Sequence, residues 1–342
     1  MEVIVVMEVK PLIGGGWFGS LCRCTRAVHP AIYAALVIAC ALATFVVKRG
    51  ADGIFACPAD GYGDDHYLAY CQAEGYGEYE HGAFWFGLEP SLKDFVSHAD
   101  VIILGNSRMQ HAFSTAATDG WFRAAGVRYY LLGFAFDEND IFEGRLLHML
   151  SAHPRVYIVN LDGFFDTPES QLSQSMAQID TEYRYEVKRF WQYAQESICG
   201  LWPALCGDRS VIFRSRRTGA WHVEGLAKVI GRPVSYRETP EANAVSVSVA
   251  EARKFVGDLP VKKSCVLMTI VSTTGTNYAT AQAIAGELGL EFIAPRLEDL
   301  TTFDGSHLDE ESAEKWSKAF FEEAAPHIRK CIAAPADTAL GR

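Results

Sequence analysis

Residues 101–108 read VIILGNSR: a run of four apolar residues is followed by glycine, asparagine, serine and arginine. The apolar run has the length and composition of a strand that is buried on both faces. The turn after it contains Gly105 and leads into a helical stretch, which places Ser107 on a tight strand-to-helix turn. A hydroxyl there lies near backbone N–H groups, which stabilise negative charge. The segment therefore predicts a core strand and a candidate nucleophile.

Further apolar runs of the same character follow, and amphipathic stretches such as 138–151 and 276–288 separate most of them. The other predicted strands are residues 129–134, 156–161, 265–271 and 291–294. Alternating strands and helices predict an α/β fold in which helices cover both faces of a parallel sheet. The stretch 168–260 breaks the alternation and is rich in aromatic and basic residues. We interpret it as an insertion that packs over the sheet or lines a cleft.

In open α/β sheets, ligands bind beyond the carboxyl ends of the strands. The third strand ends in Asn160 and Asp162, and the turn Asp304-Gly305-Ser306-His307 comes after the last strand and before an amphipathic helix at 308–325. A serine nucleophile needs a general base within hydrogen-bond reach, and that base needs an acidic group to hold its tautomer. The pattern therefore predicts Ser107, His307 and Asp304 as a catalytic triad.

These blocks, LGNSR at 104–108, DGSHL at 304–308 and SAEKWS at 312–317, resemble those of the SGNH/GDSL hydrolase superfamily over about residues 98–328. The resemblance implies a three-layer sandwich with a parallel sheet of the SGNH or flavodoxin-like kind. It also implies that Ser107 is the nucleophile, that Asp304 and His307 complete the triad, and that Gly133 donates to the oxyanion hole.

The third block departs from the family pattern, which is Gly-x-Asn-Asp. The sequence NLDGFF at 160–165 offers Asn160 two positions early. Gly163 or Asp162 lies nearer the expected place. Asn160 is the candidate for the third oxyanion donor, after the N–H groups of Ser107 and Gly133. Two interpretations of Arg108 stay open. It binds an anionic substrate, or it pairs with a nearby carboxylate at the start of the helix.

Charge and composition exclude several other classes of protein. The chain has 342 residues, is 49% apolar and carries a formal net charge of −11. An acidic chain is a poor match for nucleic acid, since neutralising phosphates needs a basic surface. Histidines and cysteines lack zinc-site spacing and no nucleotide-binding fingerprint occurs, so we expect neither a metal nor a cofactor.

The 21 residues between Arg26 and Lys48 contain no formal charge and read AVHPAIYAALVIACALATFVV. A helix of that length spans roughly 30 Å, the thickness of a bilayer core. We predict a transmembrane helix at 27–47. A cleaved secretory signal, a lipoprotein signal at Cys40 and a buried core helix are the alternatives. The first two are disfavoured because a long segment precedes the apolar run and Lys48 and Arg49 end it.

Cysteine positions bear on the compartment. Cys57 and Cys71 bracket one short loop, and Cys199 and Cys206 bracket another. Disulfides would close both loops in an oxidising compartment, and unpaired thiols are the alternative. With the slight excess of positive charge before residue 27, this favours a single-pass protein of the inner membrane whose amino terminus lies inside and whose catalytic domain lies in the periplasm.

The expected organisation is a cytoplasmic tail at 1–26, the membrane helix, an extracytoplasmic stalk or lead-in at 48–97, an SGNH-like domain at 98–330 and a tail at 331–342. This architecture is similar to that of SGNH-like proteins that acylate or deacylate cell-envelope polymers. The expected function is a serine esterase or O-acyltransferase acting on acyl esters, acetyl esters first, of an envelope glycan or other envelope polymer. A multi-spanning acyl-transfer protein is the expected partner. The alternative is a catalytically silent module that binds a glycan or anchors a partner.

Overall fold

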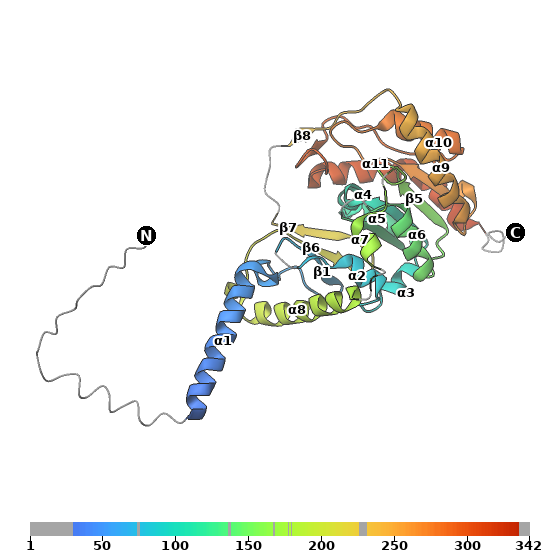
Figure 1. Ribbon diagram of the computed structural model, residues 1–342. Coiled ribbons are helices and arrows are strands. Elements are labelled where there is room, and N and C mark those ends of the chain that lie inside the picture. Colours follow the sequence, from blue (N-terminus) through green and yellow to red (C-terminus); the bar gives the residue numbers. More distant parts are fainter. Residues whose placement is uncertain are drawn as a thin grey trace, which may run out of the picture. The chain divides into compact units, whose positions relative to one another are not determined.

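The computed structural model describes residues 30–73, 76–135, 138–166, 168–176, 178, 180–225 and 231–334, without the side chains of 44–52 (Figure 1). The predicted cytoplasmic tail and residues 335–342 of the predicted carboxyl-terminal tail lie outside these ranges. The chain divides into two compact units, Met1–Arg49 and Gly50–Arg342. All sites discussed below belong to the second unit.

Helix α1 (Pro30–Asp52) covers most of the segment predicted to cross the membrane. The structure does not describe residues 27–29 or the side chains of residues 44–52. Among the residues that are described, no helix has the length and apolar character that a membrane span requires. The membrane anchor at 27–47 therefore stays a prediction.

The centre of the second unit is a five-stranded parallel sheet with the order β10-β9-β5-β3-β4. Its strands are β3 (Val101–Asn106), β4 (Tyr129–Phe134), β5 (Val156–Asn160), β9 (Val266–Thr269) and β10 (Glu291–Phe292). Each corresponds to one of the predicted apolar runs, so the prediction of an α/β fold with a parallel sheet is confirmed.

The order of these strands fixes where a ligand can bind. Numbered along the chain, the strands lie in the order 2-1-3-4-5, a common order of doubly wound sheets. The direction of winding reverses between β3 and β5, which pair in register from Val101 with Val156 to Leu104 with Val159. The residues that follow these two strands therefore meet at the crevice where such sheets bind ligands.

Successive strand residues face opposite helical layers. Ile103, Leu131 and Ile158 belong to one apolar cluster, whereas Ile102 and Tyr157 belong to another. The first cluster is completed by α4 (Ser107–Phe113), α5 (Ala116–Ala125) and α11 (Glu310–Ala333). The second is completed by α2 (Glu80–Trp85), α6 (Asp140–Met149), α9 (Ala242–Asp258) and α10 (Tyr278–Leu288). Strand residues buried on both faces explain why the runs show no alternation of polar and apolar residues.

A second, antiparallel sheet joins the expected lead-in to the expected insertion. Its order is β2-β1-β6-β7, with β1 (His66–Cys71), β2 (Gly77–Glu78), β6 (Val211–Ser215) and β7 (Trp221–Glu224). Strand β1 pairs with β6 across about 145 residues of sequence, from His66 opposite Ser215 to Cys71 opposite Val211. Residues 54–97 are thus part of the compact unit. Their short strands were not anticipated because the pairing partner is so remote in sequence.

The remaining described elements are short, apart from α8 (Thr181–Leu201), which packs on β1 and α2 within the second apolar cluster. They are η2 (Ile54–Ala56), α3 (Leu92–Ser97), α7 (Gln171–Ser175), η3 (Pro203–Leu205), β8 (Arg232–Pro233), η4 (Lys263–Cys265) and β11 (Thr301–Thr302). The predicted insertion at 168–260 consequently supplies a long helix, two strands of the second sheet, and α9.

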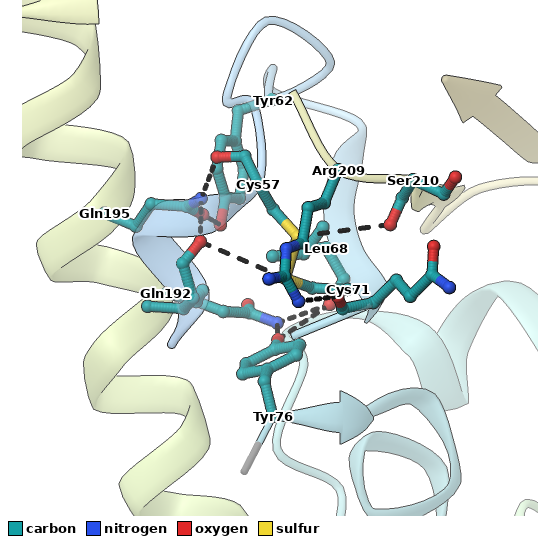
Figure 2. The surroundings of a disulfide bond; sticks show 11 residues. Cys57, Tyr62, Leu68, Cys71, Tyr76, Gln192, Gln195, Arg209 and Ser210 are labelled. Atoms are coloured by element: carbon teal, nitrogen blue, oxygen red, sulfur yellow. Dashed lines mark hydrogen bonds between the residues drawn. A yellow bond between two sulfur atoms is a disulfide. The ribbon is translucent and has the colours of Figure 1, made fainter. Parts of the chain in front are cut away.

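Three disulfides cross-link the second unit. Cys57–Cys71 and Cys199–Cys206 are the pairs that the sequence suggested, and the structure favours them over unpaired thiols. Figure 2 shows the first of them beside α8. The third, Cys265–Cys331, joins the turn directly before β9 to α11, and the sequence does not predict it because 66 residues separate its cysteines.

Loss of the long-range disulfide should destabilise the protein more than loss of the short one. In the chain-entropy model, closing a 66-residue loop contributes about 4 kcal/mol and closing a 7-residue loop about 2 kcal/mol. Urea unfolding of Cys265→Ser/Cys331→Ser, with Cys199→Ser/Cys206→Ser as the matched control, measures both. Equal losses of unfolding free energy, or a larger loss for the short loop, would contradict the expected order.

Candidate active site

Ser107 lies where β3 ends and α4 begins, as the sequence predicts. Gly105 has φ +148°, and a Cβ on it would lie 2.9 Å from Cβ of Asn160, so only glycine fits. Asn106 caps α4: its Oδ1 accepts the Arg108 backbone N–H at 3.1 Å. Its Nδ2 donates to the Asp162 carbonyl at 2.8 Å, which joins the turn after β3 to the turn after β5. The backbone that carries Ser107 is thereby fixed on both sides.

The turn of residues 304–307 lies between β11 and α11 and holds its own acid and base in place. Oδ1 of Asp304 accepts the backbone N–H groups of Ser306 and His307, both at 2.8 Å. Gly305 adopts φ +93°, a conformation that favours glycine. One carboxylate oxygen of Asp304 thus closes the turn, which leaves the other free to hold the imidazole.

The structure brings the three predicted triad residues into one hydrogen-bonded chain. Ser107 Oγ lies 2.8 Å from His307 Nε2, and His307 Nδ1 lies 2.7 Å from Asp304 Oδ2. The side chains of His307 and Asp304 are 20% and 37% exposed, so a substrate from solution can reach them. This is the nucleophile, base and orienting acid arrangement of serine hydrolases.

The surroundings of Asp304 keep it ionised. Burial would raise the pKa of this carboxyl, but the hydrogen bonds from the His307 side chain and from two backbone N–H groups outweigh burial and lower the pKa below its usual value. An ionised Asp304 fixes the proton of His307 on Nδ1, which leaves Nε2 as the acceptor facing Ser107. The imidazole is therefore in the tautomer that a general base requires.

Arg108 links the three turns of the site. Its guanidinium pairs with Asp162 after β5, and its Nε donates to Ser306 Oγ at 2.8 Å. Of the two readings open from sequence, the structure favours pairing with a carboxylate. The side chain remains 34% exposed beside the triad, so pairing does not remove it from the substrate's reach. Its principal contribution is to tie the nucleophile's turn to the base's turn.

The two predicted oxyanion residues lie in different surroundings. Asn160 ends β5 and is fully buried; its Oδ1 accepts the Val271 N–H at 3.1 Å, and its Nδ2 has no partner among the described residues. Gly133 lies inside β4, opposite Gly105 in the sheet, and its carbonyl accepts Gln110 Nε2 at 2.9 Å.

Packing alone accounts for the glycine at 133. A Cβ there would lie 2.3 Å from Cε of Met109 and 2.6 Å from the Gly105 carbonyl oxygen. Gly133 is therefore a strand residue on which α4 packs closely. Asn160 carries a buried side-chain donor, Nδ2, that has no partner among the described residues.

Aromatic residues that the sequence did not single out surround His307. Phe303 stacks on its ring with centroids 5.5 Å apart, and the ring of His111 lies 4.7 Å away. His111 is one helical turn after Ser107 on α4 and also contacts Trp221 of β7. The i, i+4 spacing from a candidate nucleophile is the sequence signal that would have found it.

His111 stays neutral at physiological pH. Burial, and next the nearby charge of His307, lower the pKa of His111 to about 3. An uncharged ring beside His307 packs against the predicted base without opposing a positive charge on it.

His111→Phe should therefore leave the pH dependence of activity unchanged. A group with a pKa of about 3 is uncharged from pH 5 to 9, so it cannot supply an acid limb in that range. Phenylalanine keeps the ring contacts with Phe303 and Trp221. The check is kcat/KM for an activated acetyl ester between pH 5 and 9. If the acid limb moves or disappears in the variant, His111 is a titrating group of the reaction.

A buried carboxyl, that of Glu143, contacts the turn that carries Ser107. Glu143 of α6 is fully buried, and its Oε1 accepts the Gly105 N–H at 3.3 Å. Burial raises the pKa of Glu143 well above its usual value, and its carboxyl contacts the turn that carries Ser107. A glutamate in a predicted amphipathic helix gives no sign of this role, because such residues usually face solvent.

Within the described residues, no group of three or more histidine, cysteine, aspartate or glutamate side chains has an arrangement that could hold a metal ion. Comparison with protein-family models, with curated protein sequences and with solved structures gives no match. The geometry of the site is therefore the basis for the candidate function.

Proposed function

We propose that the protein is a serine esterase or O-acyltransferase of the SGNH type, and that it acts through an ester of the acyl group with Ser107. The observation that carries this proposal is the continuous chain of hydrogen bonds from Ser107 Oγ through His307 to Asp304, at 2.8 and 2.7 Å. The order of the parallel strands and the position of the triad at their carboxyl ends support the fold implied by the family resemblance.

The reaction is a double displacement. Ser107 Oγ attacks the acyl carbonyl carbon while its proton passes to His307 Nε2. The bond from carbon to the leaving alcohol then breaks, and His307 returns the proton to the leaving oxygen. Water or a sugar hydroxyl next attacks the Ser107 ester and gives its proton to His307, which passes it back to Ser107 Oγ. Asp304 stabilises the imidazolium in both steps.

We assign Asn160 as the side-chain donor to the oxyanion, together with the backbone N–H of Ser107. Because the Asn160 oxygen is committed to Val271 N–H, its amide nitrogen is directed elsewhere and is unpaired within the described structure. An oxyanion needs a side-chain N–H group that is not already bonded to another acceptor, and Asn160 Nδ2 is such a group. Gly133 is the weaker candidate, since its surroundings explain it by packing.

The proposed setting is extracytoplasmic and membrane-anchored. Three disulfides support an oxidising compartment, because such bonds rarely persist in the cytosol. The uncharged segment at 27–47 supports an inner-membrane anchor with the catalytic unit in the periplasm. The substrate we propose is an acetylated glycan or other acylated polymer of the cell envelope, and a multi-spanning membrane protein is the proposed acyl-transfer partner.

Labelling with a fluorophosphonate probe tests the proposal. Only an activated serine reacts, so the intact protein should be labelled on Ser107, and Ser107→Ala should not be labelled. Ser97→Ala is the matched control, because the Ser97 hydroxyl at the end of α3 bonds only to local partners, the Asp94 carbonyl at 3.1 Å and His98 Nδ1 at 3.3 Å. An unlabelled native protein would favour the second candidate, a silent module that binds a glycan or anchors a partner. The departure of the third block from the family pattern is the feature that favours it.

Product analysis separates the two activities. With an acetylated glycan and water alone, an esterase releases acetate. With a second, unacetylated glycan present, a transferase moves the acetyl group to it. Both activities should be lost in Ser107→Ala, since both pass through the same ester.

A further inference from the structure

Exposed apolar side chains of the second unit are concentrated in one stretch of the chain. Among the described residues from 54 to 334, seven of the eleven large apolar side chains that are exposed lie between 183 and 205. They are Tyr183, Val187, Phe190, Tyr193, Leu201, Trp202 and Leu205. A concentration of this kind is typical of a surface that contacts something other than water.

Helix α8 carries the first part of this surface. Its buried face, which includes Tyr185, Gln192 and Gln195, packs on the domain. Tyr183 and Phe190 are two turns apart on the opposite face and are 69% and 64% exposed. The outer face of α8 therefore carries large apolar side chains that the domain does not cover.

The loop after α8 carries the most exposed part, which we call the apolar tip and define as Leu201, Trp202 and Leu205. These side chains are 71%, 60% and 59% exposed. The disulfide Cys199–Cys206 closes the loop, so the tip is held in shape without being packed. Among the described tryptophans, Trp202 is the one that is exposed.

The polypeptide enters the second unit directly beside this tip. Gln195 of α8 donates from Nε2 to the Ile54 and Cys57 carbonyls at 2.7 and 2.8 Å (Figure 2 shows Gln195 extending toward Cys57). Just after the tip, the Gly207 N–H donates to the Phe55 carbonyl at 2.8 Å, and the Arg209 N–H to the Ala56 carbonyl at 3.1 Å. The end of α8 and the entry segment Ile54–Ala56 thus form one hydrogen-bonded structure.

The short connection to the proposed anchor limits how far the tip can lie from a membrane. From Lys48, which follows the apolar segment, to Ile54 is six residues, or at most roughly 21 Å at about 3.5 Å per residue. Where residues 27–47 cross a bilayer, the entry segment and the adjacent tip lie close to the lipid headgroups. No other group of exposed apolar residues in the described structure is tied to the anchor in this way.

We propose that the apolar tip, with the outer face of α8 beside it, inserts into the interfacial region of the bilayer that holds the anchor. The inference rests on the proposed anchor and is independent of the chemistry at Ser107. Tryptophan, tyrosine and leucine are the side chains that favour this region. Helix α8 carries three acidic and three basic side chains, so its charges neither attract nor repel anionic lipid strongly. Apolar insertion, insensitive to salt, is the expected mode of contact.

Quenching of tryptophan fluorescence by brominated lipid tests this docking. The full chain is reconstituted into phosphatidylcholine vesicles with or without bromine on the upper acyl chain. We expect the native protein to be quenched, and we expect Trp202→Phe to lose that quenchable component at both low and high salt. Trp121→Phe is the matched control: Trp121 is a half-buried residue of α5 that stacks on Phe321, and its removal should leave quenching as in the native protein.

Two results would overturn the inference. In the first, native protein and Trp202→Phe are quenched equally, so Trp202 does not reach lipid. In the second, Trp202 is not quenched, and a photoreactive residue placed at position 183 or 190 cross-links two copies of the chain. That result would mean that a second copy covers the surface. Fluorophosphonate labelling of the same samples reports the state of Ser107 independently, which separates failure of docking from failure of the proposed activity.

Discussion

Ser107→Ala is expected to lower kcat/KM for an activated acetyl ester by about 10⁴-fold or more, with no measurable change in unfolding free energy. The Ser107 hydroxyl bonds to His307 Nε2 at 2.8 Å, so its removal leaves no nucleophile beside the proposed base. The fold is unaffected because the Asn106 cap and the Arg108 ion pair, which hold the turn, use other atoms. Initial rates of p-nitrophenyl acetate hydrolysis and urea unfolding of the same preparations measure the two effects.

The outcome depends on a control for surface reactivity. Ser97→Ala, at an exposed hydroxyl on α3, should retain the native rate. A Ser107→Ala protein that keeps the native rate would show that another group carries the chemistry. Equal losses in both variants would point to a general loss of folded protein.

The second large effect concerns stability: Arg214→Ala should lower the free energy of unfolding by about 3–5 kcal/mol. Arg214 of β6 is fully buried and donates to Glu80 Oε2 and to the Leu131 carbonyl, both at 2.7 Å. Its guanidinium also lies between the rings of Phe84 and Phe134, at 4.6 and 4.8 Å from their centroids. Removing it leaves Glu80 buried beside the junction of the two sheets without its cation.

Two further variants identify the cause of the loss. Arg214→Met/Glu80→Met removes both charges and fills much of the same volume, so it should be more stable than Arg214→Ala. Arg217→Ala changes an arginine that is 67% exposed and should shift stability by less than about 0.5 kcal/mol. Urea unfolding curves of all three give the comparison. If the double variant is the least stable, the ion pair itself stabilises the fold and the explanation by an uncompensated buried charge is wrong.

The parts of the fold that sequence predicts well are those determined by local composition. The apolar runs that became β3, β4 and β5 are buried on both faces, so each is recognisable without knowledge of its neighbours. The same holds for Ser107 and His307, because a glycine turn after a strand and an Asp-x-x-His turn before a helix place side chains by local geometry. Their meeting at 2.8 Å is not local, because the 304–307 turn follows β11, which pairs with β8 outside the parallel sheet.

The features that escaped prediction depend on residues far apart in the chain. The second sheet needs β1 and β6, and the third disulfide needs Cys265 and Cys331; neither pair has a local pattern. The contact between His111 and His307 is of the same kind, since 196 residues separate them (307 minus 111). Arg108 shows a further limit of prediction from sequence. Its position at the start of the helix indicated a carboxylate partner, but not that this partner is Asp162.

The measurement that tests the central claim most directly is capture of the acyl-enzyme. The full chain is mixed with p-nitrophenyl acetate, quenched in acid within the first turnovers, and digested for mass analysis. We expect one acetyl group on the peptide that contains Ser107, and no acetylated peptide in Ser107→Ala. Asp304→Asn should accumulate the ester far more slowly, because the tautomer of His307 is no longer held. Turnover without acetyl on Ser107, or acetyl on another residue at the native rate, would contradict the account.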